Sequence, residues 1–178
     1  TYFNAQGFTK QFVVSPLVSD ILALTQLYGA ATTTRTGDTR YGFGNTSGRA
    51  IYDAATYTNI TYTVIDHGGG DTLDYSGFGV VQRINLNAET FSDIGGRVGN
   101  VSIARGTLIE NAVGGSAKDT IYGNAANNQI EGNGGDDILL GNNGNDYLLG
   151  GDGNDVIVGG ADDDSLSGGA GVNELIGG

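Results

Sequence analysis

The sequence predicts an all-β fold: short parallel strands wound into a right-handed β-roll (β-helix), preceded by irregular β coils and one N-terminal α-helix. Three regularities indicate the roll. Between residues 114 and 178, glycine returns at every ninth position, beginning with Gly114. Each complete nine-residue frame also has Ile or Leu at its eighth position and Asp or Asn at its sixth. The frame reads G-G-x-G-x-D-x-U-x, with U aliphatic, so a glycine-rich turn alternates with a short x-U-x strand.

The sixth position of the frame predicts metal sites. If two frames form one coil, frames two apart stack, and their sixth-position side chains converge between neighbouring coils. The candidate pairs are Asp119 with Asp137, Asp137 with Asp155, Asp146 with Asp164, Asn128 with Asp146, and Asp155 with Asn173. Ca²⁺ prefers about six to eight oxygen ligands at ~2.3–2.6 Å, from carboxylates and main-chain carbonyls. The repeats therefore predict several calcium ions between the turns.

Composition agrees with a calcium-dependent fold. The chain of 178 residues has 20 acidic and 8 basic side chains and a formal net charge of −12. In residues 114–178 the only basic side chain is Lys118. Because such like charges repel, we expect the chain to be expanded without calcium and folded with it. No cysteine is present, so no disulfide can staple the chain.

Composition also limits the partners. The acidity argues against nucleic acid and anionic membranes. No apolar run reaches the ~18 residues of a membrane span, and no N-terminal signal peptide is visible. The chain opens at Thr1 without Met, and we expect it to be an internal part of a larger protein.

The chain divides into three predicted segments. In residues 1–30, Ser15 and Pro16 are suited to begin a helix over about residues 16–28, and Gly29 to end it. Residues 31–113 are an irregular β-rich lead into the roll, with alternating apolar residues around Tyr62, Ile84 and Val101. Residues 114–178 are the roll itself, which we expect to continue beyond its last residue. Residues 66–74 and 105–113 fit the nine-residue frame in degenerate form.

Several short segments occur in an order that resembles the serralysins, secreted bacterial zinc metalloproteases of the metzincin group. These segments are SPLVSDI at 15–21, LYGA at 27–30, TRTGDT at 34–39, DHGGGDTL at 66–73, NVSIA at 100–104 and IENA at 109–112. The resemblance implies a secreted, extracellular zinc endopeptidase acting on protein substrates, whose catalytic domain precedes the roll and has its C-terminal end in residues 1–30 of this chain. It also implies a C-terminal β-sandwich after it and a bacterial type I export machinery. Tyr2 then matches the tyrosine that ligates zinc after the Met-turn.

The resemblance also implies particular calcium ligands. Before the repeats they are Arg35, Gly37 and Thr39 in one turn, Asp66, Gly68, Gly69 and Asp71 in a second, and Leu108 and Glu110 in a third. Within the repeats the candidate ligands are Gly115, Asp119, Asn128, Gly132, Gly134, Asp137, Gly141, Asn143, Asp146, Gly150, Asp152, Asp155 and Asp164. The frames beginning at Gly123 and Gly159 should bind more weakly, because Asn128 lacks a charge and Asp162 replaces a turn glycine.

Zinc is expected only in the intact enzyme. A metzincin holds zinc through H-E-x-x-H-x-x-G-x-x-H, whereas this chain has one histidine, His67, which fits a turn residue. We therefore expect no protease activity from this chain alone. Two alternatives remain: a calcium-dependent adhesin or surface binding module with the same repeats, and a non-protease enzyme with such repeats. The second should show a nucleophile elbow, which the sequence lacks.

The outer faces of the predicted roll differ in polarity. In alternate frames the residues beside U include Ile138, Leu140, Val156 and Val158, whereas the other set includes Gln129, Tyr147 and Ser165. We expect the apolar face to be covered by further chain.

Overall fold

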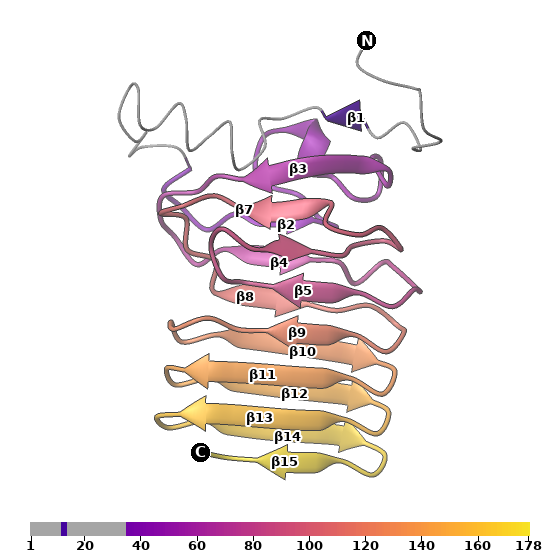
Figure 1. Ribbon diagram of the computed structural model, residues 1–178, viewed down its shortest axis with the longest axis vertical. Helices are drawn as coiled ribbons and strands as arrows, with labels where there is room; N and C mark the ends of the chain where they lie inside the picture. The colour runs from indigo at the N-terminus through magenta and orange to yellow at the C-terminus, as the bar shows by residue number, and fades with distance from the viewer. Residues whose placement is uncertain (1–11, 14–34) are drawn as a thin grey trace.

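The computed structural model describes residues 12–13 and 35–178. Strands follow one another along its long axis, with the later strands stacked as successive coils toward the C-terminus (Figure 1). The predicted helix over residues 16–28, Tyr2 and most of the segment 1–30 lie outside the described residues. No helix in the described ranges is long and apolar enough to cross a membrane.

The described residues form fifteen strands and one short 3-10 helix, η1 (Ala50–Tyr52). The strands before the repeats are β1 (Phe12–Val13), β2 (Arg40–Gly42), β3 (Ile60–Val64), β4 (Thr72–Asp74), β5 (Arg83–Asn85), β6 (Phe91–Ser92), β7 (Val101–Ile103) and β8 (Asn111–Val113). The strands of the repeats are β9 (Thr120–Tyr122), β10 (Gln129–Gly134), β11 (Ile138–Asn143), β12 (Tyr147–Asp152), β13 (Val156–Ala161), β14 (Ser165–Ala170) and β15 (Glu174–Ile176).

Two parallel sheets make the roll. One has the order β14-β12-β10-β8-β4-β2, and the other β15-β13-β11-β9-β5. From β8 and β9 onward, partners in each sheet are 18 residues apart, as Ile130 is with Leu148 and Leu139 with Ile157. Two frames therefore form one coil and frames two apart stack, which confirms the predicted parallel roll.

The eighth position of each frame builds the core. Ile121, Ile130, Leu139, Leu148 and Ile157 are all 0% exposed and belong to one hydrophobic cluster. The two sheets enclose this single layer of aliphatic side chains, so burial comes mainly from stacking one coil on the next. In the last described coil the column opens toward solvent, because Leu175 is 45% exposed.

The register of the repeats extends backward as predicted. Leu73 of β4 pairs with Ala112 of β8, and Ala112 pairs with Ile130 of β10. Leu73 and Ala112 are both 0% exposed. Residues 66–74 and 105–113 are therefore genuine, if irregular, frames of the roll.

The strands of the central coils are longer than predicted. The frame predicts three-residue strands, and β9 and β15 have that length, but β10 to β14 each have six residues. The extra pairing involves turn positions, such as Asn133 with Gly151 and Gly134 with Asp152. Because consecutive turns have the same length and lie in register, their backbones continue the sheet.

The first coils add a third sheet, and its buried residues, such as Tyr62 and Val101, belong to the same hydrophobic cluster as the repeats. A third sheet has the order β1-β3-β7-β6. The alternation around Tyr62 predicts one buried face for β3, but Thr61 and Thr63 on the other side are only 8% and 0% exposed. Both faces of this strand are covered, and the Thr63 hydroxyl contacts that of Ser102 at 2.9 Å.

Candidate metal sites between stacked turns

The sixth-position side chains form a ladder along the sheet that contains β9, β11 and β13. The main-chain N–H of Asp119 donates to Oδ1 of Asp137 at 2.7 Å, and that of Asp137 to Oδ1 of Asp155 at 2.9 Å. At the last rung, the Asp155 N–H donates to Oδ1 of Asn173 at 2.8 Å. Each carboxylate or amide thus reaches back one coil, as the predicted pairing requires.

A second ladder runs along the opposite sheet. The N–H of Asn128 donates to Oδ1 of Asp146 at 2.7 Å, and that of Asp146 to Oδ1 of Asp164 at 2.9 Å. Earlier in the chain the same relation joins Thr39 to Asp71 and Asp71 to Glu110, with both distances 2.8 Å. All five predicted sixth-position pairs are therefore brought together.

The second carboxylate oxygen of several rungs has no partner. Among the described residues, Oδ2 is buried without a hydrogen bond in Asp71, Asp137, Asp146, Asp155 and Asp164. A buried charged oxygen without a donor or a cation is strongly destabilising. These five atoms are arranged where a cation between turns would use them.

The first-position glycines allow this placement. A Cβ on Gly132 would lie 2.4 Å from Oδ2 of Asp137 and 2.6 Å from the carbonyl oxygen of Gly150. At Gly141 the corresponding distances are 2.1 Å to Asp146 Oδ2 and 2.5 Å to the Gly159 carbonyl. A carboxylate oxygen and a main-chain carbonyl oxygen therefore line the same side of each glycine. Hard oxygen donors of these two kinds are the ligands that calcium takes.

Burial and neighbouring charges shift the pKa values of several of these carboxylates upward. Burial raises the pKa of Asp71 and of Asp137 to about 7, and that of Asp146 to about 6. Neighbouring carboxylates raise these pKa values further, since Asp137 lies between Asp119 and Asp155. A divalent cation at the same place would remove this penalty.

In the first complete coil of the repeats, unlike the later ones, both polar atoms of each sixth-position side chain have hydrogen-bond partners. Both oxygens of Asp119 accept hydrogen bonds: Oδ1 from the Gln82 N–H at 2.7 Å, and Oδ2 from the Gly115 N–H at 2.6 Å. Gln82 Nε2 also approaches Asp119 Oδ2 at 3.4 Å, and Gln82 Oε1 is buried without a partner. Burial raises the pKa of Asp119 as well.

The side-chain amide of Asn128 likewise already has hydrogen-bond partners. Its Oδ1 accepts the Asn124 N–H at 2.8 Å, and its Nδ2 donates to the Glu110 carbonyl at 2.9 Å. Asn124 itself is 7% exposed and donates to the carbonyls of Leu86 and Ile109.

Sequence reasoning did not identify Gln82 or Asn124. Gln82 belongs to an irregular coil outside any frame, so no periodic signal marks it. Asn124 occupies a second position where other frames also have Asn, and its burial depends on the preceding coil.

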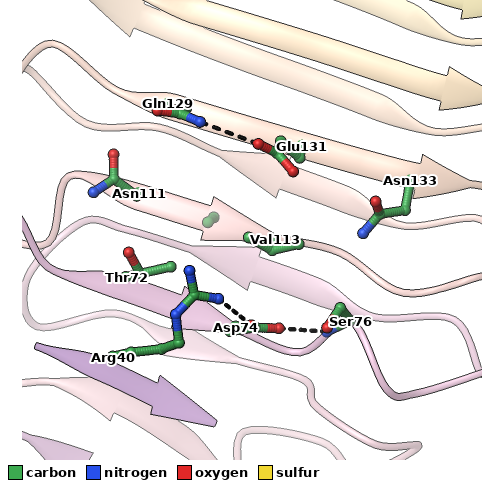
Figure 2. Close-up of a pocket in the computed structure, with 10 residues that line it drawn as sticks. Arg40, Thr72, Asp74, Ser76, Asn111, Val113, Gln129, Glu131 and Asn133 are labelled. Carbon is green, nitrogen blue, oxygen red and sulfur yellow. Dashed lines mark hydrogen bonds and ion pairs between the residues drawn. The ribbon is translucent and has the colours of Figure 1, made fainter. Parts of the chain in front are cut away.

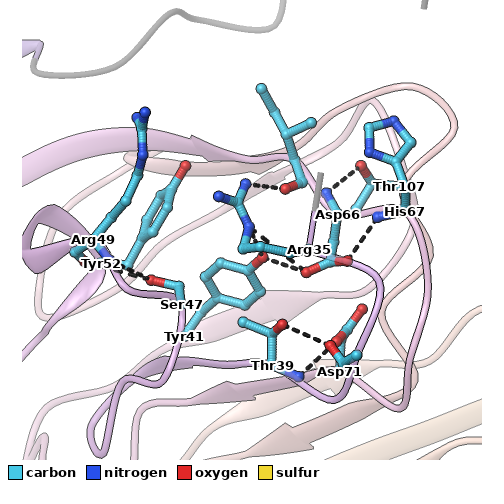
Figure 3. Close-up of polar contacts among 12 residues, drawn as sticks. Arg35, Thr39, Tyr41, Ser47, Arg49, Tyr52, Asp66, His67, Asp71 and Thr107 are labelled. Carbon is cyan, nitrogen blue, oxygen red and sulfur yellow. Dashed lines mark hydrogen bonds and ion pairs between the residues drawn. The ribbon is translucent and has the colours of Figure 1, made fainter. Parts of the chain in front are cut away.

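The ligands predicted before the repeats also gather in neighbouring turns (Figure 3). A Cβ on Gly69 would lie 2.7 Å from the Gly37 carbonyl oxygen, and the Arg35 carbonyl accepts the His67 N–H at 3.3 Å. Asp71 Oδ2 is the unpartnered oxygen of this group.

Asp66 has a different environment from Asp71. Its Oδ2 accepts the Tyr41 hydroxyl at 2.5 Å and lies 3.8 Å from Nε of Arg35. Its Oδ1 accepts the N–H groups of His67 and Gly68 at 2.6 and 3.3 Å. Asp66 is 0% exposed, and both of its carboxylate oxygens accept hydrogen bonds. It thereby joins the first two turns to the buried ring of Tyr41.

The other predicted ligands are distributed along the stacked turns. The carbonyl of Gly115 accepts the Gly134 N–H at 3.2 Å, and that of Asp152 accepts the Gly135 N–H at 2.8 Å. Asn143 pairs with Ala161 in the sheet, and the side chain of Leu108 is 48% exposed. No cluster of three or more His, Cys, Asp or Glu side chains in the described ranges could hold a metal ion. A cation here would need main-chain carbonyls beside one or two carboxylates.

Comparison with known proteins shows that the chain is similar to part of several bacterial proteins named as serralysins or metallopeptidases. Residues 30–172 match the family described as peptidase M10 serralysin C terminal. The chain is 49% identical over 118 residues to metallopeptidase AprA of Pseudomonas marginalis, covering 66% of this chain and 25% of that protein. It is 50% identical over 115 residues to serralysin B of Dickeya chrysanthemi, covering 64% and 24%. It is 51% identical over 126 residues to serralysin of Photorhabdus sp. (strain Az29), covering 68% and 26%. The chain thus spans about a quarter of the length of these curated relatives.

Proposed function

This chain belongs to the peptidase M10 serralysin C-terminal family, and from that premise we propose that it is the calcium-binding roll of a secreted zinc metalloendopeptidase. In this proposal the roll folds when it binds calcium after export and then stabilises the protease. The names of the relatives favour this function over an adhesin with similar repeats.

The observation that supports calcium binding is the set of buried, unpartnered Oδ2 atoms at five rungs of the two ladders. Calcium would supply the missing positive charge, and its binding free energy would become folding free energy. Weak extracellular sites are typically half-saturated at about 10⁻⁴–10⁻³ M calcium. Such affinities would favour an unfolded, exportable chain inside the cell and a folded roll outside it.

The strongest candidate ligands lie in the later coils. Asp137 with the Gly150 carbonyl, and Asp146 with the Gly159 carbonyl, each line one glycine. Asp155 and the Gly168 carbonyl line Gly150 in the same way, at 2.2 and 2.5 Å from its Cβ position. The sites at Asp119 and Asn128 should depend less on calcium, since N–H donors already occupy their side chains.

The turns before the repeats form a further proposed site. Gly37, Thr39 and Asp71 come together, and Asp71 contributes an unpartnered oxygen. Within this set Asp71 is the stronger candidate, because the carboxylate of Asp66 already accepts several donors.

The rest of the intact protein would supply the chemistry. We propose that zinc is held by a preceding catalytic domain, with Tyr2 as the ligand after the Met-turn, and that proteins are its substrates. Export through a bacterial type I machinery belongs to the same proposal. The roll contributes stability and supports the catalytic domain, so this chain alone should not cleave protein.

The apolar outer face has a proposed partner in the same protein. Ile138, Leu140, Val156 and Val158 are half-buried on one face, whereas Gln129 and Tyr147 on the other face are exposed. We infer that a C-terminal β-sandwich of the intact protein covers the apolar face.

A calcium titration of the 178-residue chain tests the proposal. Far-ultraviolet circular dichroism should show conversion from coil to β structure as calcium rises to the millimolar range. Magnesium at the same concentrations should have little effect, because it demands a smaller octahedral shell. A spectrum that is the same in chelator and in excess calcium would contradict the proposal.

A further inference from the structure

A polar groove crosses the outer face of the sheet that contains β2, β4, β8 and β10. It has a volume of about 410 Å³, and none of the carboxylates with an unpartnered Oδ2 lines it. Its polar lining includes Arg40, Asp74, Asn111, Gln129, Glu131 and Asn133, which come from four adjacent strands (Figure 2). These side chains point away from the aliphatic core, so packing of the core does not explain why they are polar.

The groove carries little net charge. Arg40 forms an ion pair with Asp74, and Asp74 also accepts the Ser76 N–H at 2.9 Å. Glu131 is the one remaining charged side chain of the lining, and its Oε1 accepts Gln129 Nε2 at 3.0 Å. In a chain of net charge −12, this near-neutral surface does not favour a polycation or a polyanion.

The amide side chains present oriented acceptors. Asn111 Nδ2 donates to the Asp71 carbonyl at 3.1 Å, and Asn133 Nδ2 donates to the Gly114 carbonyl at 2.8 Å. With these donors directed to the backbone, each Oδ1 is left to accept from a ligand. Gln129 is held in the same way by its bond to Glu131. The groove therefore offers several fixed acceptors to a ligand rich in hydroxyl donors.

An exposed aromatic side chain lies beside Gln129, at the same frame position of the next strand in the sheet. Tyr147 of β12 is the sheet partner of Gln129, and it is 45% exposed. Adjacent strands lie about 4.8 Å apart, which is comparable to the length of one pyranose unit. A sugar chain crossing the strands could therefore meet one polar row per unit and stack its C–H face on the tyrosine ring.

We propose that this groove binds a neutral oligosaccharide, with the side-chain oxygens of Asn111, Gln129 and Asn133 accepting its hydroxyl protons and Tyr147 stacking on one ring. The ligand class follows from fixed acceptors, near-zero charge and a flanking aromatic ring. The inference does not depend on the protease activity, and it would give the roll a second role in attaching the protein to glycans.

Isothermal titration of the calcium-loaded 178-residue chain tests the proposal. The probes are cellohexaose, maltohexaose and the hexamer of N-acetylglucosamine, each at millimolar concentration. At least one should bind with a Kd in the millimolar range or lower, and the binding should persist at high salt, because no ionic contact contributes to it.

Two substitutions locate the binding. Tyr147→Ala should weaken it about fivefold, by the loss of one stacking contact, and Gln129→Leu should weaken it by removing an acceptor at similar volume. Ser165→Ala is the matched control, because Ser165 is exposed at the same frame position one coil after Tyr147 but has no aromatic ring and does not line the groove. Circular dichroism in calcium confirms that each variant folds.

The outcomes are distinct. Weakening in both groove variants with an unchanged control supports the proposal. Failure of all three probes to bind overturns it, as does binding that both groove variants retain. Salt-sensitive binding of tetralysine that Glu131→Gln abolishes, with no sugar bound, would instead assign the groove to a basic peptide.

Discussion

The main-chain N–H of Asp137 donates a 2.9 Å hydrogen bond to Oδ1 of Asp155, the equivalent residue one coil later, while Asp155 Oδ2 is buried without a partner. One carboxylate thus has two separate tasks. One oxygen joins neighbouring coils, and the other is the oxygen that we propose as a calcium ligand. The same division recurs at Asp137, Asp146 and Asp164.

A second set of rungs also joins neighbouring coils. At the fifth position, the Asn145 N–H donates to Asn127 Oδ1 at 2.9 Å, and the Asp163 N–H donates to Asn145 Oδ1 at 3.1 Å. Here each side chain accepts from the following coil, whereas the sixth-position side chains accept from the preceding one. Because adjacent rungs act in opposite directions, each turn of the folded roll is bonded to the coil before it and to the coil after it.

Asp137→Asn should remove metal binding and leave the register intact. Asn173 shows that an amide can keep the ladder, since its Oδ1 accepts the Asp155 N–H. We expect about one fewer calcium ion per chain by isothermal titration, because the site loses a charged ligand. Asp119→Asn is the control and should change the calcium count little, since both of its oxygens already accept N–H donors. Equal losses in the two variants would contradict this assignment.

Gly150→Ala should destabilise the roll severely. The new Cβ would lie 2.2 Å from Asp155 Oδ2 and 2.5 Å from the Gly168 carbonyl oxygen. Relieving these contacts must move backbone, so we expect a loss of roughly 3 kcal/mol in the free energy of unfolding, measured by urea denaturation in excess calcium. Gly177→Ala is the matched control, because a Cβ there meets nothing within 4 Å. Similar midpoints for the two variants would refute the steric argument.

The repeats could be predicted because each frame determines its neighbour's environment. A Leu at the eighth position of one coil packs on the Leu or Ile 18 residues later, so periodicity alone placed Leu148 and Ile157 in the core. The same reasoning placed Asp137 beside Asp155. It extended to Leu73 and Ala112, which pair in the same sheet although Asp66 and Arg105 replace the first-position glycine of their frames.

Prediction failed where contacts depend on one irregular coil. The hydrogen bond from Gln82 to Asp119 joins residues 37 apart, a separation unrelated to the 18-residue coil. Thr61 and Thr63 are buried although they alternate with the apolar residues of β3, which no local pattern reveals. The six-residue strands were missed because glycine has low strand propensity, although stacking supplies its hydrogen-bond partners.

Leu148→Ala should be costly in the centre of the roll. Leu148 is 0% exposed, and its removal leaves a cavity between coils. We expect a loss of about 2–5 kcal/mol by urea denaturation in excess calcium. Leu175→Ala provides the comparison, since Leu175 has the same frame position but is 45% exposed. A loss for Leu175→Ala as large as that for Leu148→Ala would show that the last coil is covered in solution.

Without calcium, the roll should be favoured by mild acid. Burial raises the pKa of Asp137 to about 7 and that of Asp146 to about 6, both above the value of 3.8 for an exposed carboxyl. The folded state therefore binds protons more tightly than the unfolded state. The resulting stability is fully present below about pH 4 and is lost as the pH rises through about 6 to 7. In chelator, circular dichroism should thus show more β structure at about pH 5 than at about pH 8.

The double variant Asp137→Asn/Asp146→Asn should show a smaller difference, because two of the titrating groups are removed. In excess calcium the preference should disappear, since protons compete with the metal for the same oxygens. A calcium-free chain that loses β structure on acidification from about pH 8 to about pH 5 would contradict this account.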